Sequence, residues 1–126
     1  MNPVKNVVLF CDNCVAQNKN NTTLHYLAWR IDSGLNESIS LNFLLTGHTK
    51  FSPDRSFGLV KLEYSRSNVD CYQDFEDVVV RSSHNKFNQA VNGSKIEWRS
   101  WDSYFGEFYK RLPGITKYHH FDFRKN

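Results

Sequence analysis

The chain has 126 residues, of which 40% are hydrophobic and 15% aromatic, a composition that indicates a folded domain and excludes an intrinsically disordered protein. Its net charge of +3 permits a polyanionic partner without requiring one, because dedicated nucleic-acid-binding domains are usually more basic. The longest apolar runs, of about five residues, are too short to span a bilayer. We therefore expect a single domain over residues 1–126, with no membrane partner.

The N-terminus and the cysteines indicate an intracellular protein. Met1 is followed almost directly by a strand-like run, which leaves no room for a secretory signal. The odd number of cysteines, three, fits reduced thiols in the cytosol or nucleus rather than a disulfide framework. We expect a nuclear or cytoplasmic location and no secretion.

The first half of the chain predicts a parallel β-α-β-α unit. Residues 5–11 form a nearly continuous β-prone run, typical of a strand buried on both faces. Residues 20–33 have an amphipathic helical stripe, with Asn and Thr residues at the start and Gly34 at the end. A second central strand is predicted over residues 38–46, and a helix is predicted to begin at Ser52.

The second half is less regular, and we expect it to form an irregular α+β C-terminal extension. Helical spacing of apolar residues predicts a helix over about 69–81. Short strands are predicted near 89–91 and over 95–99. A strong aromatic stripe predicts a helix over 101–112 that packs into the core, and a last strand is predicted over 118–123.

Two carboxylates occupy positions that suit metal-ion chemistry. Asp12 follows the first strand, and the carboxyl ends of strands in open α/β sheets are where ligands and metal ions bind. Asp54 lies in the first turn of the helix that follows the second strand. Because parallel strands end at the same edge of a sheet, the loops carrying Asp12 and Asp54 are expected to share that edge. Each acid alone is more simply explained as a turn or helix-cap residue.

This order of elements is similar to that of ribonuclease-H-like enzymes, which hold two magnesium ions roughly 4 Å apart between carboxylates. Mg²⁺ prefers the oxygen ligands that Asp and Glu provide, and Mn²⁺ is the alternative ion. Asp12 and Asp54 match the second and third acids of that fold, and His48 is a candidate proton shuttle.

Several polar side chains near the two acids are candidates for contacts with nucleic acid. Gln17 and Asn18 are candidate hydrogen-bond donors to a phosphate or a base edge. Four cationic residues flank the acids and could follow a DNA backbone electrostatically: Lys19, Lys50, Arg55 and Lys61. The simpler interpretation of these cations is a solvated surface.

Three sequence blocks extend the comparison to a family. They read LFCDNCVAQNKNN over 9–21, FLLTGHTKFSPDRSFGLVK over 43–61 and LPGITKYHHFDF over 112–123. Together they resemble a family of eukaryotic transposon-derived proteins whose domain of unknown function is related to the DDE transposase and retroviral integrase core. The resemblance implies metal-dependent phosphodiester chemistry on DNA, with Asp12 and Asp54 as two of the metal-binding acids and His48 beside them.

The resemblance also implies that the chain is the C-terminal part of a larger ribonuclease-H-like domain. The family's domain begins with further strands that carry the first acid, and no strand precedes residues 5–11 here. We therefore expect little or no nuclease activity from this chain alone. A missing N-terminal segment or a homo-oligomer is the expected partner.

Other interpretations of the sequence stay open at this point. Cys11 and Cys14 form a C-x-x-C after a strand, the context of a redox site. A zinc site would need two more ligands, which Cys71 with His84, or His119 with His120, could supply. A non-enzymatic alternative is a domesticated remnant that binds nucleic acid or protein. In that case the polyanion contacts would come from the C-terminal basic residues Lys110, Arg111, Lys117, Arg124 and Lys125.

Overall fold

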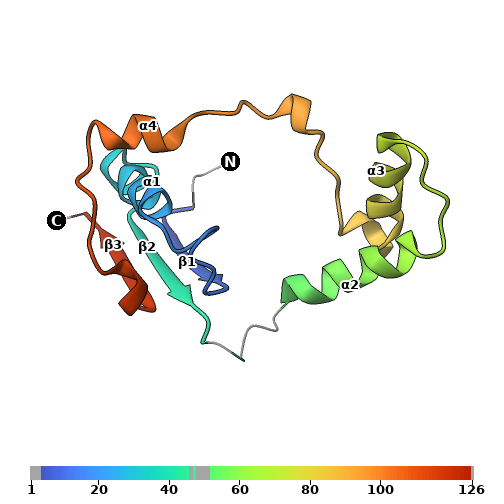
Figure 1. Ribbon diagram of the computed structural model, residues 1–126, viewed down its shortest axis with the longest axis horizontal. Coiled ribbons are helices and arrows are strands. Elements are labelled where there is room, and N and C mark those ends of the chain that lie inside the picture. The colour runs from blue at the N-terminus through green and yellow to red at the C-terminus, as the bar shows by residue number, and fades with distance from the viewer. Residues whose placement is uncertain (1–3, 46, 48–51, 126) are drawn as a thin grey trace. The chain divides into compact units, whose positions relative to one another are not determined.

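The computed structural model describes residues 4–45, 47 and 52–125, which form a small α/β protein with a three-stranded mixed sheet and four α-helices (Figure 1). The elements are β1 (Asn6–Cys11), α1 (Asn21–Asp32), β2 (Ser38–Phe43), α2 (Ser52–Tyr64), α3 (Tyr72–Arg81), α4 (Trp101–Gly106) and β3 (His120–Arg124), with short 3₁₀ helices η1 (His84–Lys86), η2 (Gly93–Lys95) and η3 (Ile115–Lys117). No helix among these described residues is both long and apolar enough to cross a membrane.

The chain, expected from its sequence to be one domain, packs as two compact units. Unit 1 combines Met1–Thr49 with Arg99–Asn126, and unit 2 is Lys50–Trp98. Unit 1 contains the sheet with α1 and α4, and unit 2 contains α2 and α3.

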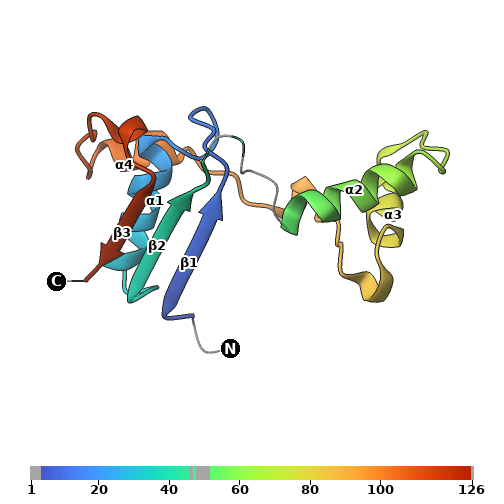
Figure 2. The same cartoon turned by 90° about the horizontal axis from the view of Figure 1, so that it is seen from below.

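The sheet of unit 1 has the strand order β1-β2-β3 (Figure 2). β1 and β2 are parallel, from Asn6 opposite Ser38 to Cys11 opposite Phe43, which confirms the predicted pairing of the first two strands. β3 pairs with β2 in the antiparallel direction, with His120 opposite Asn42. The C-terminal segment is therefore not only an irregular extension, because it supplies one edge of the sheet.

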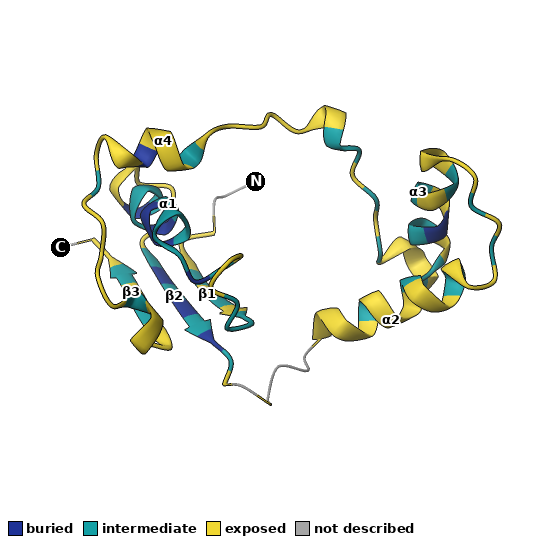
Figure 3. Ribbon diagram, in the orientation of Figure 1, coloured by how far each residue is buried: buried dark blue, intermediate teal, exposed yellow. Residues whose placement is uncertain are grey.

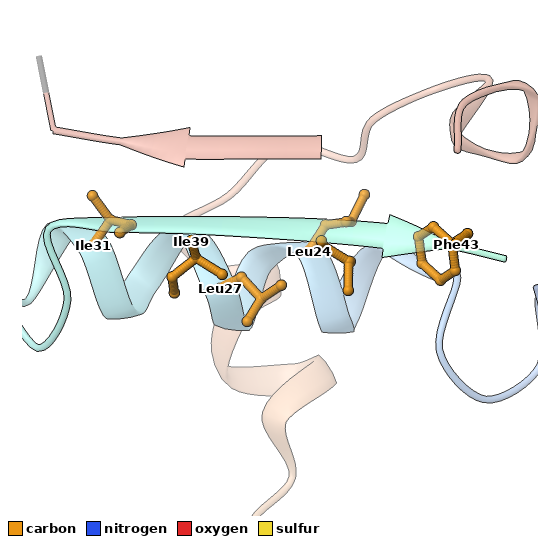
Figure 4. Packing of buried hydrophobic residues seen from close by; sticks show 6 residues of the cluster. Leu24, Leu27, Ile31, Ile39 and Phe43 are labelled. Atoms are coloured by element: carbon orange, nitrogen blue, oxygen red, sulfur yellow. The ribbon is translucent and has the colours of Figure 1, made fainter. Parts of the chain in front are cut away.

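The core of unit 1 lies between one face of this sheet and α1. Leu24, Leu27 and Ile31 recur at helical spacing on α1, and alternate residues of β2 meet them from the sheet (Figure 4). All six residues of this cluster have at most 4% of their surface exposed: Leu24, Leu27, Ile31, Ile39, Leu41 and Phe43.

The ends of α1 follow the capping rules that the sequence indicated. Asn20 is the N-cap, and its side-chain oxygen accepts a hydrogen bond from the Thr23 backbone N–H at 2.9 Å. Gly34 adopts φ 71°, the left-handed conformation that glycine tolerates best after a helix. The predicted helix is confirmed to within one residue at each end.

The prediction that the first strand is buried on both faces is wrong. Residues of β1 alternate between exposed and half-buried (Figure 3). Val8 and Phe10 are 63% and 57% exposed. In unit 1 only one face of the sheet packs against α1, and β1 has β2 as its one strand neighbour among the described residues. A continuous apolar run thus overestimates burial at the edge of a sheet.

The predicted C-terminal helix is shorter than its aromatic stripe, since α4 ends at Gly106. Phe105 is fully buried against α1, whereas Phe108 is 65% exposed and Leu112 is 47% exposed. Glycine is a poor helix former, and Pro113 prevents the next turn from re-forming. The stripe therefore contributes to the core through its first half only.

Tyr109 fastens the segment after α4 to α1 and gives unit 1 a pH-dependent contact. Its hydroxyl donates to Asp32 Oδ2 at 2.7 Å, and burial together with this bond raises the pKa of Tyr109 to about 12. The unfolded phenol ionises near pH 10, so the folded state retains the proton between these values. The contribution of Tyr109 is thus present below pH 10 and is lost as the pH rises through about 12.

We expect Tyr109→Phe to remove this alkaline loss of stability. Urea unfolding between neutral pH and pH 12 should show a steeper decline for the wild-type protein than for Tyr109→Phe. Tyr118→Phe, which removes a phenol that is 60% exposed, is the control. Parallel stability curves for the wild type and Tyr109→Phe would contradict the assignment.

Unit 2 is a pair of helices with little buried surface. Val78 of α3 is fully buried, Tyr64 and Phe75 meet edge to face at 6.0 Å, and α2 has no buried residue. α3 begins at a cap in which the Asp74 carboxylate accepts the backbone N–H groups of Asp70 and Cys71. These bonds lower the pKa of Asp74.

The two short strands predicted near 89–91 and over 95–99 are absent from the described residues of unit 2. Instead, the Asn92 side chain accepts the backbone N–H of Ser94 and initiates the 3₁₀ helix η2. The Trp98 indole N–H donates to the Gly93 carbonyl at 3.1 Å and closes this turn. Local side-chain hydrogen bonds thus override a weak strand propensity.

Candidate functional site at the ends of the parallel strands

Asp12 lies at the carboxyl end of the parallel strand pair. It follows Cys11, the last residue of β1, and Cys11 is opposite Phe43, the last residue of β2. The Leu44 N–H donates to the Cys11 carbonyl at 2.9 Å and continues the pairing past both strands. The half-buried Asp12 side chain is therefore held at the sheet edge where α/β folds place ligands.

The loop between β1 and α1 is organised around one carbonyl group. The Cys14 carbonyl accepts the backbone N–H groups of Gln17, Asn18 and Lys19 at 3.3, 2.9 and 3.1 Å. This turn brings the Asn18 side chain back toward the strand end, where its Nδ2 donates to Asp12 Oδ1 at 2.8 Å. Asn18, predicted to contact a ligand, is thus bonded to the candidate catalytic carboxylate.

Lys19 is the most unusual residue of this loop, because its side chain is only 1% exposed. Its Nζ donates to Asn13 Oδ1 at 2.9 Å and lies 5.2 Å from the centre of the Phe43 ring. Burial lowers the pKa of Lys19. The prediction of a solvated cation that follows a DNA backbone does not hold for Lys19, which instead fastens the loop to the end of β2.

Asn20 completes the local structure of the D-N-C-x-x-Q-N-K-N-N block. Besides capping α1, its Nδ2 donates to the Gln17 carbonyl at 3.1 Å. Three of the four asparagines and the lysine therefore hold the loop in shape, while the side chain of Gln17 is exposed. The sequence indicated the polarity of this block but not that most of it is bonded internally.

Cys11 and Cys14 do not have the environment of a reactive dithiol. Both are unbridged and half-buried. Burial, followed by the neighbouring charge of Asp12, raises the pKa of Cys11, which favours the protonated and less nucleophilic thiol. Cys71 belongs to unit 2, where it is the N-cap of α3.

The remaining predicted site residues belong to unit 2 or lie outside the described residues. Asp54 is exposed in the first turn of α2, and Arg55 and Lys61 are exposed on the same helix. Arg55 also lines an open apolar cavity of about 790 Å³ within unit 2, beside Phe57 and Val79. His48 and Lys50 lie outside the described residues. Asp12 is in unit 1 and Asp54 is in unit 2, so the pairing of these two acids stays a prediction.

The described part of the chain does not by itself complete a metal site. No group of three or more His, Cys, Asp or Glu side chains there is arranged to hold a metal ion. At the end of β1 the fitting donor is the Asp12 carboxylate, oriented by Asn18. A divalent ion held at this edge would need further oxygen ligands from elsewhere.

The structure also reveals a polar network that the sequence analysis did not identify. On the face of the sheet opposite α1, His120 Nδ1 lies 2.7 Å from Asn42 Oδ1, and His120 Nε2 lies 3.1 Å from Asp122 Oδ2. Ser40 donates to the other oxygen of Asp122, and these contacts lower the pKa of that carboxyl. Polar and apolar residues alternate over 120–124, which indicates a strand with one polar face. The residues of β2 that bond to His120 and Asp122 are about eighty positions away in sequence, so no local pattern identifies them.

Comparison with known proteins identifies the family. Residues 4–126 match the family described as "Domain of unknown function (DUF7869)", which is nearly the whole chain. No curated protein and no solved structure matches the sequence. The chain belongs to the DUF7869 family, whose function is unknown.

Proposed function

We propose that this chain contributes to a metal-dependent site for phosphodiester chemistry on DNA, of the transposase or integrase type, as part of a larger ribonuclease-H-like core. The observation that carries the proposal is the position of Asp12. Its carboxylate lies at the carboxyl end of two parallel strands, and an amide donor holds one of its oxygens. An orienting hydrogen bond of this kind is usual behind a metal-ligating carboxylate, and it supports this role for Asp12.

The proposed roles follow from what each side chain contacts. Asp12 is the metal ligand and Asn18 is a positioning residue that orients it. The sequence resemblance, rather than a contact, adds Asp54 in the first turn of α2 as the second proposed acid. A bound Mg²⁺ or Mn²⁺ would polarise the phosphorus centre and stabilise charge on the leaving oxygen. Lys19 stabilises the loop through the hydrogen bond that its Nζ donates to Asn13 Oδ1.

Contacts with DNA are assigned to the exposed residues of the predicted set. Gln17 has an exposed side chain in the loop after β1, and Arg55 and Lys61 are exposed cations on α2. Such cations contribute salt-dependent affinity for phosphates. His48 remains the proposed proton shuttle, and Lys50 a further phosphate contact.

The test is Mn²⁺ binding, followed by paramagnetic broadening of amide resonances in residues 12–20. We expect weak binding that broadens these resonances in the wild-type protein and is lost in Asp12→Asn. Asparagine can still accept the Asn18 hydrogen bond, so this variant removes the charge while the loop keeps its shape. Glu37→Gln, which removes an exposed acid paired with Lys5, is the matched control and should behave as the wild type.

The outcomes of this experiment are distinct. Equal broadening in Asp12→Asn and the wild type would overturn the assignment of Asp12. Mn²⁺-dependent cleavage of a DNA duplex by this chain, abolished in Asp12→Asn, would support Asp12 and overturn the expectation that the chain needs a larger core. Binding without cleavage is the expected result.

A second candidate function is a non-catalytic domain that binds nucleic acid. It is favoured by the exposure of all five basic residues in the C-terminal segment: Lys110, Arg111, Lys117, Arg124 and Lys125. Deleting residues 110–126 would not test this function, because the deletion removes β3 from the sheet. Lys110, Lys117 and Lys125 should instead be changed to Gln, which for this function would weaken DNA binding and reduce its salt dependence by about one phosphate contact per residue. Asp12→Asn should then leave the affinity unchanged.

A further inference from the structure

Asn92 and Gly93 form the one Asn-Gly pair in the sequence. In such a pair the backbone nitrogen of glycine can attack the side-chain amide carbon of asparagine and close a five-membered succinimide ring. Glycine favours this reaction because it has no Cβ to hinder the approach and rotates freely about its backbone bonds. Whether a folded chain permits the reaction depends on the local contacts of the two residues.

The backbone of the turn does not require glycine at position 93. Asn-Gly pairs are common in tight turns where glycine takes a positive φ. Gly34, Gly47 and Gly114 take a positive φ in this chain, whereas Gly93 does not. A Cβ added to Gly93 would meet the Trp98 ring at 3.9 Å, an ordinary van der Waals contact. The turn therefore accommodates alanine at this position, so glycine can be replaced without altering the fold.

The contacts of the Asn92 side chain activate its amide carbon. Its Oδ1 accepts the Ser94 backbone N–H at 2.9 Å and the Ser94 hydroxyl at 2.8 Å. Two donors on a carbonyl oxygen draw electrons from its carbon and stabilise the negative charge that the oxygen acquires when a nucleophile adds. The Asn92 Nδ2 has no hydrogen-bond partner among the residues that the structure describes, so no contact there holds the leaving amide group.

The attacking nitrogen is also available. The Gly93 N–H is the first of η2, a position whose N–H has no acceptor within the helix. It donates no hydrogen bond to any other described residue. The ψ angle of Asn92 is 124°, so the bond between its Cα and carbonyl carbon must rotate to bring this nitrogen to Cγ. Only the single turn of η2 opposes that rotation, because the other residues of 87–100 form neither helix nor strand.

We propose that Asn92 is a site of spontaneous deamidation in the folded protein, promoted by the donors of Ser94. The Gly93 nitrogen loses its proton and bonds to Asn92 Cγ, and the bond between Cγ and Nδ2 breaks as ammonia leaves. Water then adds to one of the two ring carbonyls and opens the succinimide, which gives aspartate or isoaspartate. A neutral amide is replaced by a carboxylate, so the net charge of +3 falls by one.

The two products affect unit 2 differently. Aspartate retains a side-chain oxygen that accepts the Ser94 N–H, and aspartate is a favoured residue at helix N-caps. Isoaspartate inserts a methylene group into the backbone. It thereby displaces the Asn92 carbonyl from the Lys95 N–H and the Gly93 carbonyl from the Trp98 indole. The isoaspartate product is therefore expected to unfold η2.

The experiment follows the full chain by peptide mapping and mass spectrometry during incubation at mildly alkaline pH, both folded and in urea. We expect Asn92 to convert to aspartate and isoaspartate in the folded protein. Gly93→Ala, which the turn accommodates, should slow the conversion about tenfold or more. Ser94→Ala removes the hydroxyl donor and should slow the conversion about threefold or more in the folded protein, but not in urea, where the turn is absent.

Each outcome supports or overturns the site. If Asn92 stays intact in the folded protein but converts in urea, the turn protects it and the proposal is wrong. Equal rates for the folded wild type and folded Ser94→Ala would overturn the activation by Ser94. Asn36 is the internal control, because it is 4% exposed and bonded to Arg30 and Val4. Conversion of Asn36 at the rate of Asn92 would show that unfolded molecules react, which also overturns the proposal. The proposal does not depend on the role of Asp12.

Discussion

Replacing Lys19 with alanine is expected to lower the free energy of unfolding by about 2–4 kcal/mol. The side chain is 1% exposed, so truncation leaves a cavity between the loop and Phe43. It also leaves Asn13 Oδ1 without its 2.9 Å donor. Urea unfolding monitored by circular dichroism measures the loss.

Lys19→Met separates the packing of this side chain from its charge. Methionine keeps the apolar stem and, like alanine, leaves Asn13 Oδ1 without its donor, but it also removes the cost of burying an ammonium, which offsets that loss. We expect Lys19→Met to remain within about 1 kcal/mol of the wild type at neutral pH. Equal losses in Lys19→Ala and Lys19→Met would show that the ammonium and its hydrogen bond to Asn13, rather than the packing, hold the loop.

The same pair of proteins yields a test of the lowered pKa of Lys19. At low pH both folded and unfolded states are protonated, and the cost of burying the ammonium is fully present. As the pH rises through the lowered folded pKa toward 10.5, the folded state releases its proton first. The wild-type protein should therefore gain stability relative to Lys19→Met over this range, opposite in sign to the effect of Tyr109.

Phe105→Ala is expected to cost about 3–5 kcal/mol, the largest effect of any substitution considered for unit 1. Phe105 is fully buried and contacts several rings, stacking on Trp101 with centroids 5.3 Å apart and meeting Tyr104 edge to face at 5.4 Å. It also lies 6.2 Å from Trp29 of α1, so truncation removes much of the contact between α1 and α4.

Phe108 is the matched control for Phe105. The two residues belong to one aromatic stripe in the sequence, but Phe108 is 65% exposed. We expect Phe108→Ala to change the free energy of unfolding by less than about 0.5 kcal/mol. Similar losses for both substitutions would mean that the helix continues past Gly106 and that the stripe packs as the sequence predicted.

The parallel pairing of the first two strands and the position of Asp12 could be predicted from sequence because each depends on local signals. Periodicity identifies α1, and its Asn20 and Gly34 caps mark the ends. The order strand-helix-strand then restricts the topology to a parallel pair. Each of these signals spans only a few residues. The burial of one face of α1 against the sheet stabilises the same helix and strands that the signals predict.

The internal bonding of the loop after β1 could not be predicted in the same way. A sequence shows that Asn18 and Lys19 are polar, but polarity is equally compatible with binding a ligand and with bonding to Asp12 or Asn13. The turn around the Cys14 carbonyl decides between them by directing these side chains toward the end of the sheet.

The sequence by itself determined that the fold is of the α/β class, which elements form its first half, and that one carboxylate, Asp12, lies at the end of a strand. Tertiary structure alone decided that β3 pairs with β2, that β1 is only partly buried, and that Lys19 is buried. The physical reason is that strand pairing and burial depend on contacts between residues far apart in the chain. β3 and β2 meet across about eighty positions, and no local pattern encodes which edge receives which strand.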